Sequence, residues 1–211
     1  MSAAEQDLDI AIGHFAELLA SNLHAQRAAH FPPDAQKVMR SLSSGEAAEL
    51  LGVDHTYLRK LHREGKISDV ETTAGSHRRY TLDDIWEIRH SLEANAKKPG
   101  TYVPGRRSGD ELQVVSVVNF KGGSGKTTTS AHLAQRLAFK GYRVLAIDLD
   151  PQASMSALHG IQPELDLMEG GTLYDAVRYD DPVPISEVIR KTYIRGLDLI
   201  PGNLELMEFE H

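Results

Sequence analysis

The strongest structural signal in this chain is the octet Lys121-Gly122-Gly123-Ser124-Gly125-Lys126-Thr127-Thr128. An uncharged apolar run over residues 114–118 precedes it, and a helical pattern of alanines and leucines over residues 131–138 follows it. Strand, glycine-rich turn and helix are the context of a phosphate-binding loop, because glycine lets backbone N–H groups approach a phosphate and a helix N-terminus favours negative charge. The sequence therefore predicts an α/β domain with a parallel sheet and a nucleotide site.

Two side chains of the octet have the chemistry that a bound nucleotide requires. We expect Lys126 to reach the β and γ phosphates and the Thr127 hydroxyl to ligate Mg²⁺. The standard motif needs glycine at position 120, where this chain has Phe120, and a second lysine, Lys121, opens the loop instead. The alternative is a surface turn with solubilising lysines, which the agreement of strand, loop and helix disfavours.

A pair of carboxylates follows the next apolar run. Residues 143–148 suit a buried parallel strand and lead into Asp148-Leu149-Asp150-Pro151-Gln152. Side chains two residues apart point the same way while a strand persists, and ligands of open α/β sheets sit at this carboxyl edge. We therefore expect Asp148 and Asp150 in the nucleotide site. The alternative is an ordinary Asp-Pro turn.

The composition is that of one or two globular domains. Of the 211 residues, 41% are hydrophobic and 25% are charged. No apolar run approaches the ~20 residues of a membrane span. The chain has no cysteine, which excludes disulfides and cysteine-ligated zinc, and its ten histidines show no metal-binding spacing. We expect a cytoplasmic protein with no membrane partner.

The charge is distributed unevenly along the chain. The net charge of −7 divides into −3 over residues 1–39, +2 over residues 40–107 and −6 over residues 108–211. A basic segment between acidic flanks is typical of a small DNA-binding module.

The basic segment has the pattern of helix, glycine turn and helix, followed by a two-stranded wing over residues 66–80 and a further helix. The second strand of the wing is expected to be basic. The expected helix caps and stops are, in chain order, Ser43 or Ser44, Gly52, Asp54, Gly65 and Thr81.

This stretch resembles the MerR-type winged helix-turn-helix. The resemblance rests on residues 46–53, Tyr57-Leu58-Arg59, Glu64-Gly65 and Arg78-Arg79-Tyr80-Thr81. In that family the second helix enters the major groove and wing arginines touch the DNA backbone. The base-facing candidates that this implies are His55, Thr56, Arg59 and Lys60, and the implied phosphate contacts are Arg78 and Arg79. A helical connector with a solvated charged face is the alternative.

The octet resembles the deviant Walker motif of the ParA/MinD group of P-loop ATPases. In that group the opening lysine reaches the partner's nucleotide across a dimer interface, which makes Lys121 the candidate cross-dimer lysine. Residues 148–152 resemble the Asp-x-Asp-Pro-Gln segment of ParA proteins. By that resemblance, Asp150 positions the attacking water and Asp148 helps to hold Mg²⁺ through water. The implied cofactors are ATP or ADP and Mg²⁺, and the implied cofactor-binding residues are the whole octet.

The first forty residues are expected to form an amphipathic helix that ends at Pro32-Pro33. Its apolar stripe consists of Leu8, Ile12, Phe15, Leu19 and Leu23, widened by Leu18. The stripe either joins two subunits, as in ParA proteins with an N-terminal extension, or packs on the winged domain of its own chain. We expect a dimerisation helix over residues 1–40, the winged domain over 41–96, an exposed linker over 97–111 and the N-terminal part of an ATPase domain over 112–211.

This order of segments resembles the large ParA class that carries its own operator-binding domain, and within it the RepA group of repABC plasmids. The phrases at residues 119–128 and 201–210 carry that impression. The resemblance implies a dimeric, nucleoid-associated ATPase that binds operator and non-specific DNA. It also implies a ParB-type centromere-binding partner, segregation of plasmid copies and repression of its own operon. The alternative is a DNA-binding repressor fragment for which nucleotide is only a switch.

A third strand is expected over residues 197–200, close to the end of the chain. A ParA ATPase domain continues further, so we expect a truncated form or an N-terminal fragment, and we assign ATP hydrolysis to the full-length protein. Val114, Val117, Ile147 and Leu199 are then expected to expose apolar surface. Nitrogenase iron proteins share the deviant loop but need cysteines, and MinD-type ATPases end in an amphipathic membrane helix that this sequence lacks.

Overall fold

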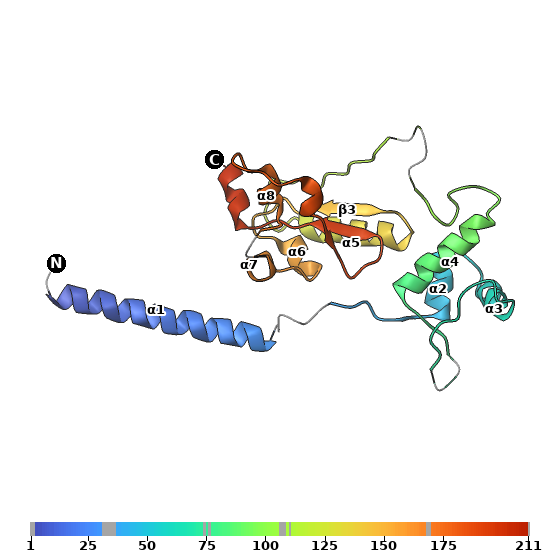
Figure 1. Cartoon of the computed structure of the whole chain (residues 1–211), viewed down its shortest axis with the longest axis horizontal. Coiled ribbons are helices and arrows are strands. Elements are labelled where there is room, and N and C mark those ends of the chain that lie inside the picture. Colours follow the sequence, from blue (N-terminus) through green and yellow to red (C-terminus); the bar gives the residue numbers. More distant parts are fainter. Residues whose placement is uncertain are drawn as a thin grey trace. The chain divides into compact units, whose positions relative to one another are not determined.

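The computed structural model describes residues 3–30, 37–73, 75, 77–105, 109, 111–167 and 170–210 (Figure 1). They belong to two compact units, Met1–Gln36 and Lys37–His211. Among the described residues, none of the helices has the length and apolar character needed to cross a membrane.

The first unit is the helix α1 (Ala3–His30), which confirms the predicted helix. Its described apolar side chains face solvent: Ile12 is 58% exposed, Phe15 65% and Leu23 61%. The side chain of Leu8 and the predicted stop at Pro32-Pro33 lie outside the described residues.

The second unit begins with a small winged module, and the predicted caps explain where its helices begin and end. Ser43 and Glu46 form a capping box at the start of the first helix, and Gly52 ends that helix in a left-handed conformation with φ 69°. The Asp54 carboxylate accepts the Thr56 N–H at 2.7 Å, which starts the second helix. The elements are β1 (Leu42–Ser43), α2 (Ser44–Leu51), α3 (His55–Arg63), β2 (Arg79–Tyr80) and α4 (Leu82–Ala94), the last capped by Thr81 with Asp84.

The wing differs from the prediction. Its basic strand β2 pairs antiparallel with β1, which precedes α2. The two sides of the wing are joined by the bridge of Thr72 to Arg78 and by the Thr73 N–H, which donates to the His77 carbonyl at 3.0 Å. The physical reason is burial: Tyr80 is only 1% exposed and joins the core beside β1, whereas the wing residues have no such core to enter.

The core of the winged module is apolar and continuous. It consists of Leu42, Ala47, Ala48, Leu51, Leu58, Leu61, Ile67, Tyr80, Leu82, Ile85, Ile88 and Leu92. Each of these side chains is buried, so the helix-turn-helix is a packed module and not a solvated connector.

The rest of the second unit is an α/β region with a small mixed sheet in the order β3-β5-β4. β3 and β5 are parallel, and β4 runs antiparallel to β5. The elements are α5 (Lys126–Phe139), β3 (Val144–Ile147), α6 (Ser154–Leu158), α7 (Pro163–Asp166), α8 (Leu173–Val177), η1 (Ile185–Glu187), β4 (Arg190–Lys191), β5 (Leu197–Ile200) and η2 (Leu204–Glu210).

The strands predicted around residues 143–148 and 197–200 are confirmed as β3 and β5. The strand predicted over residues 114–118 is wrong, because this segment belongs to no described strand and exposes 80% of Val114 and 75% of Val118. An apolar run indicates a buried strand only where a neighbouring strand can accept its backbone hydrogen bonds. The predicted exposure of Ile147 is confirmed at 47%, whereas Leu199 is fully buried because β5 is the central strand.

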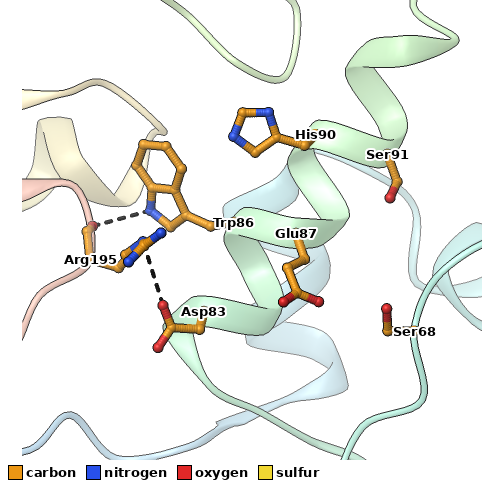
Figure 2. A pocket seen from close by; sticks show the side chains of 7 residues that line it. All are labelled: Ser68, Asp83, Trp86, Glu87, His90, Ser91 and Arg195. Carbon is orange, nitrogen blue, oxygen red and sulfur yellow. Dashed lines mark hydrogen bonds and ion pairs between the residues drawn. The ribbon is translucent and has the colours of Figure 1, made fainter.

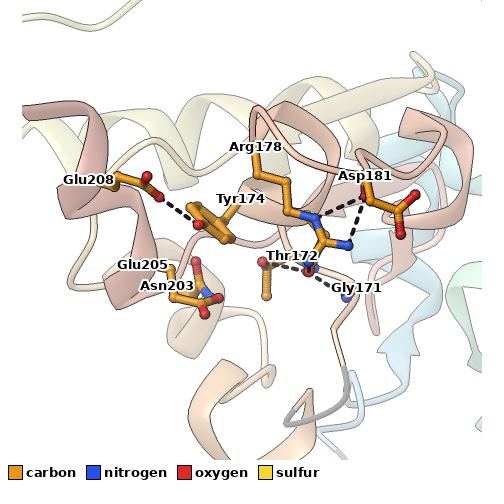
Figure 3. Close-up of polar contacts among 9 residues, drawn as sticks. Gly171, Thr172, Tyr174, Arg178, Asp181, Asn203, Glu205 and Glu208 are labelled. Atoms are coloured by element: carbon orange, nitrogen blue, oxygen red, sulfur yellow. Dashed lines mark hydrogen bonds and ion pairs between the residues drawn. The ribbon is translucent and has the colours of Figure 1, made fainter.

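A polar network fixes the last helices of this region (Figure 3). The Asp175 carboxylate accepts the N–H groups of Gly171 and Thr172 at 2.8 and 2.9 Å, and it also accepts the Thr172 hydroxyl. Burial acts to raise the pKa of Asp175, but these hydrogen bonds outweigh it and lower the pKa. The Tyr174 hydroxyl donates to Glu208 at 2.5 Å, so α8 is joined to η2.

Candidate functional site

The octet forms an open loop that leads into α5. Gly123 and Gly125 have φ angles of 68° and 83°, which glycine adopts without strain. Gly125 is the N-cap of α5 and supplies no side-chain cap, so the N–H groups of the first turn remain free for an anion. The two glycines therefore form the turn that leads into α5, and the phosphate-binding role of the loop stays a prediction.

The loop has room and donors for a polyphosphate. A Cβ built at Gly122 or Gly123 would meet nothing within 4 Å. Lys121 is exposed, and its backbone N–H donates to the Asn119 side chain at 2.8 Å. Lys126 and Thr127 are half-buried in the first turn of α5. Backbone N–H groups, an ammonium group and a hydroxyl are the donor set that fits phosphates with Mg²⁺.

The start of α5 lies at the carboxyl edge of the sheet. α5 lies against β3 (Figure 1) and leads into it through the turn at residues 140–143. The helix must therefore run antiparallel to β3, which places its first turn at the edge where β3 ends. Ala131, Ala134 and Ala138 are the buried residues of α5, and their small side chains permit a close approach of this helix to its neighbours.

Asp148 is a buried anchor at this edge. It is 4% exposed, and its Oδ2 accepts both the backbone N–H and the hydroxyl of Ser156 at 2.8 Å. The Ser156 hydroxyl in turn accepts the N–H of Gly202 at 3.2 Å. Asp148 thus ties together the segments that follow β3 and β5 and the start of α6.

Asp150 has a different environment from Asp148. It is half-buried, its carboxylate accepts the Gln152 N–H at 3.0 Å, and its own N–H donates to Asp148 at 3.3 Å. β3 ends at Ile147, so the strand alternation that would align the two carboxylates does not extend over them. The structure brings Asp148 and Asp150 together, but within the described residues no hydrogen bond or ion pair joins either of them to the octet.

Sequence reasoning missed Ser156 and Gly202. A Cβ at Gly202 would lie 2.8 Å from the carbonyl oxygen of Asp148 and 2.9 Å from that of Asp150, so the segment after β5 needs glycine for this close approach. The available signal was a Pro-Gly pair directly after a buried strand, Pro201-Gly202. Nothing in the sequence indicated that Ser156 would bind Asp148.

The predicted DNA-binding residues lie on α3, on β2 and directly before β2. Thr56, Arg59 and Lys60 are exposed on α3, and His55 is half-buried at its start. The Thr56 hydroxyl is partly engaged, because it donates to Asp54.

The cations on α3, on β2 and between these two elements differ in their surroundings. We call them the cations of the proposed DNA-binding face. The ammonium groups of Lys60 and Lys66 lie 3.7 and 2.8 Å from the Glu64 carboxylate. Arg79 is exposed on β2, and Arg78 is half-buried beside it.

A buried pair holds α3 against β2. The His62 ring nitrogen lies 2.9 Å from the Tyr80 hydroxyl, and both side chains are buried. Burial lowers the pKa of His62, and the nearby charge of Arg78 lowers it further, while burial raises the pKa of Tyr80. Across the described part of the chain, no cluster of three or more His, Cys, Asp or Glu side chains could hold a metal ion.

Two protein families match this chain. Residues 112–211 match the family described as an AAA domain, and residues 42–91 match the MerR HTH family of regulatory proteins. The predicted combination of a MerR-like helix-turn-helix with a P-loop region is thereby confirmed.

The sequence is similar to curated relatives over most of its length. It is 54% identical over 197 residues to a protein named "Putative replication protein A" of Rhizobium rhizogenes, a match that covers 93% of this chain and 49% of the relative. It is 34% identical over 185 residues to protein SopA of Escherichia coli strain K12, covering 84% of this chain and 45% of the relative. These matches confirm the resemblance predicted from the sequence. The chain spans about half the length of the curated relatives it matches.

Two solved structures are also similar to this chain. A structure named Partition Protein is 19% identical, with 94% of this chain and 52% of that chain covered and a TM-score of 0.45. A cobyrinic acid a,c-diamide synthase from Mycobacterium smegmatis, crystallised with an ATP analogue and magnesium, is 34% identical over 44% of this chain and 35% of that chain, with a TM-score of 0.39.

Proposed function

We propose that this chain, a relative of the replication protein A and SopA sequences over most of its length, is the DNA-binding and phosphate-binding part of a ParA-type partition ATPase. The full protein would segregate plasmid copies and repress its own operon. One observation carries the proposal: a helix N-terminus with an open glycine loop lies at the carboxyl edge of a sheet, in the same unit as a fully capped helix-turn-helix.

The nucleotide site is proposed from the placement of its donors. Bound Mg²⁺ and ATP supply the phosphoryl group and the cation that neutralises its charge. Lys126 and the N–H groups of the first turn of α5 bind phosphate oxygens, and the Thr127 hydroxyl holds the cation. Asp148 would help to hold Mg²⁺ through a water molecule. It also accepts the N–H of Asp150 and so orders that residue, which would orient the attacking water. These residues act by positioning and charge stabilisation.

The dimeric role is proposed from Lys121 and from the apolar stripe of α1. Lys121 is exposed at the start of the loop, where it is free to reach the nucleotide of a second subunit. The apolar stripe of α1 is exposed in the described residues and suits a helix-helix contact in a homodimer.

The DNA contacts belong to the winged module. The exposed side of α3 suits the major groove, with Arg78 and Arg79 against phosphates. The full protein would bind both operator and non-specific DNA. It would also contact a ParB-type partner and associate with the nucleoid.

A second candidate is a DNA-binding repressor for which nucleotide is a switch without hydrolysis. The observation that favours it is the contrast between the two modules. The winged module has a closed core, whereas the segment at residues 114–118, which leads into the octet, belongs to no described strand.

The test is calorimetry of ATP and ADP binding with Mg²⁺ on residues 1–211, combined with DNA binding by fluorescence anisotropy. Lys126→Ala should abolish nucleotide binding, and Lys140→Ala should not, because Lys140 lies at the other end of the same helix. DNA binding without nucleotide binding would contradict both candidates, because each needs bound nucleotide, and would leave residues 1–211 as a DNA-binding fragment alone. Loss of binding in both variants, or in neither, would contradict the assignment of the octet as the phosphate site.

A further inference from the structure

Two faces of helix α4 make contacts within the second unit. Its first face packs into the winged core, as expected for the last helix of that module. The residues of this face are Leu82, Ile85, Ile88 and Leu92. The second face carries Trp86, Arg89 and Glu93 at spacings of three and four residues, so these three side chains lie in one row along the helix. All three bind groups that belong to other parts of the second unit.

Arg89 is the centre of this row. Its side chain is buried, at 4% exposed, and its guanidinium donates to three backbone carbonyls. Two of the donor–acceptor distances are 2.9 Å to the Tyr102 oxygen and 2.8 Å to the Phe139 oxygen, and the third acceptor is Leu50. Burial lowers the pKa of Arg89. A guanidinium keeps its charge in proteins, so the site holds a buried cation that only backbone dipoles surround in these contacts.

Two of the three carbonyls lie at the ends of helices. Phe139 is the last residue of α5, and Leu50 is the penultimate residue of α2. The last carbonyls of a helix lack partners within the helix and carry its partial negative charge. A single guanidinium therefore caps two helices at once. One of them begins at the phosphate loop, and the other is the first helix of the helix-turn-helix.

Glu93 binds the segment that follows α4. Its carboxylate accepts the N–H groups of Gly100, Tyr102 and Val103, the last two at 2.8 and 3.1 Å. The linker predicted over residues 97–111 was expected to be exposed, but Tyr102 and Val103 are half-buried. This segment is thus held against α4 at the point where it also offers the Tyr102 carbonyl to Arg89.

Trp86 makes the remaining contact, at the turn before β5 (Figure 2). Its indole N–H donates to the Arg195 carbonyl at 3.1 Å, and the Arg195 guanidinium lies 3.5 Å from Asp83. Gly196 has a φ of 90°, and a Cβ there would lie 2.4 Å from the Trp86 ring. The Gly196 carbonyl accepts the N–H of Val144, the first residue of β3. The turn is therefore fitted to the tryptophan on one side and to the sheet on the other.

We infer that Arg89 is a positioning residue that fixes the winged DNA-binding module to the phosphate-loop helix α5, with Trp86 as the second contact. α5 has 14 residues and is about 21 Å long, with the octet at one end and the Arg89 contact at the other. The inference goes beyond the proposed function, because it concerns the geometry between two modules and holds without bound nucleotide or DNA.

The test is a distance measurement by pulsed electron paramagnetic resonance between two spin labels. The chain has no cysteine, so Glu49→Cys on α2 and His132→Cys on α5 introduce two unique labelling sites, and both positions are exposed. The labelled parent should give one narrow distance. Arg89→Met, which keeps the length of the stem but removes every donor, should lose the single narrow distance while circular dichroism shows unchanged helix content. Arg136→Met, which removes an exposed cation from α5, is the matched control and should keep it.

Each other result would overturn the inference. A broad distribution in the parent would show that the modules are not fixed, and a narrow one in Arg89→Met would show that Arg89 does not fix them. If Arg89→Met fails to fold, Arg89→Lys takes its place, because lysine keeps the charge but loses the planar fork that spans several carbonyls. Unfolding of both variants would make Arg89 a folding requirement and would also overturn its positioning role.

Discussion

Glu64 forms ion pairs with two lysines of the proposed DNA-binding face. Its carboxylate lies 2.8 Å from the ammonium group of Lys66 and 3.7 Å from that of Lys60. The hydrogen bond from Lys66 lowers the pKa of Glu64, and the same contact raises the pKa of Lys66. Both lysines must leave this carboxylate before they can contact phosphates. We therefore predict that Glu64→Gln strengthens DNA binding and makes it more dependent on salt.

The magnitude follows from the number of cations released. Each lysine that gains a phosphate contact adds about 0.9 to the steepness with which the logarithm of the binding constant falls with the logarithm of salt concentration. Between about 200 and 50 mM salt, one freed lysine gives the variant an additional gain in affinity of about 3.5-fold, and two give about 12-fold. Because Lys66 is the closer partner of Glu64, it should account for the larger part.

The assay is a salt titration of binding to a short fluorescent duplex, followed by anisotropy. Glu49→Gln is the matched control, since it removes the same charge from an exposed position on α2. A change in net charge alone would affect the two variants equally. The reasoning is refuted if the salt dependence of Glu64→Gln equals that of Glu49→Gln, because the two lysines would then not be phosphate contacts.

Three further predictions concern stability and assembly. Gly196→Ala should lower the free energy of unfolding by about 2–5 kcal/mol in urea denaturation, because the new methyl group meets the Trp86 ring at 2.4 Å and the residue has a φ of 90°. Burial holds the folded-state pKa of His62 below 6.5, so the unfolded chain takes up the proton first as the pH falls. The free energy of unfolding should then decrease from pH 6.5 down to the folded-state pKa, and thermal melts of His62→Phe should lack this component. Phe15→Asp, at a side chain of α1 that is 65% exposed, should convert a dimer to a monomer in sedimentation, whereas Glu17→Gln should not.

The local features of the fold could be predicted from the sequence because their causes lie within a few residues. The Ser43 and Asp54 caps, the Gly52 stop and the buried run of β3 each depend on a side chain and its immediate neighbours. The octet belongs to the same class, since its turn and the following helix start are encoded by consecutive residues.

The pairing of strands could not be predicted in the same way, because each strand depends on a distant partner. Residues 114–118 have the composition of a buried strand, yet belong to none of the described strands. β4 was missed because Arg190–Lys191 is short and charged, and its pairing with β5 is its main reason to be extended. The basic strand of the wing was predicted, but its partner β1 lies 36 to 38 positions earlier and carries no recognisable strand pattern. The paired residues are Leu42 with Tyr80 and Ser43 with Arg79.

In the candidate site, too, the features with local causes could be predicted and those that depend on distant segments could not. Its anions and cations were evident from residue type and spacing, but the burial of Asp148 depends on Ser156 and Gly202, which come from separate segments. Arg89 stands within an ordinary helical pattern, where arginine on a helix is most often a solvated residue. Only the convergence of three carbonyls from three segments distinguishes it.

The two ends of α5 now have complementary chemistry. Its N-terminal N–H groups are free for an anion, and its C-terminal carbonyl at Phe139 already binds the cation of Arg89. An unbroken helix transmits a displacement at one end to the other, because its hydrogen bonds resist bending. Since the same guanidinium also binds the end of α2, a movement of α5 on phosphate binding would displace the helix-turn-helix with it. A flexible linker alone would let the two modules respond independently, so the Arg89 contact is what would make nucleotide binding and DNA binding energetically dependent on each other.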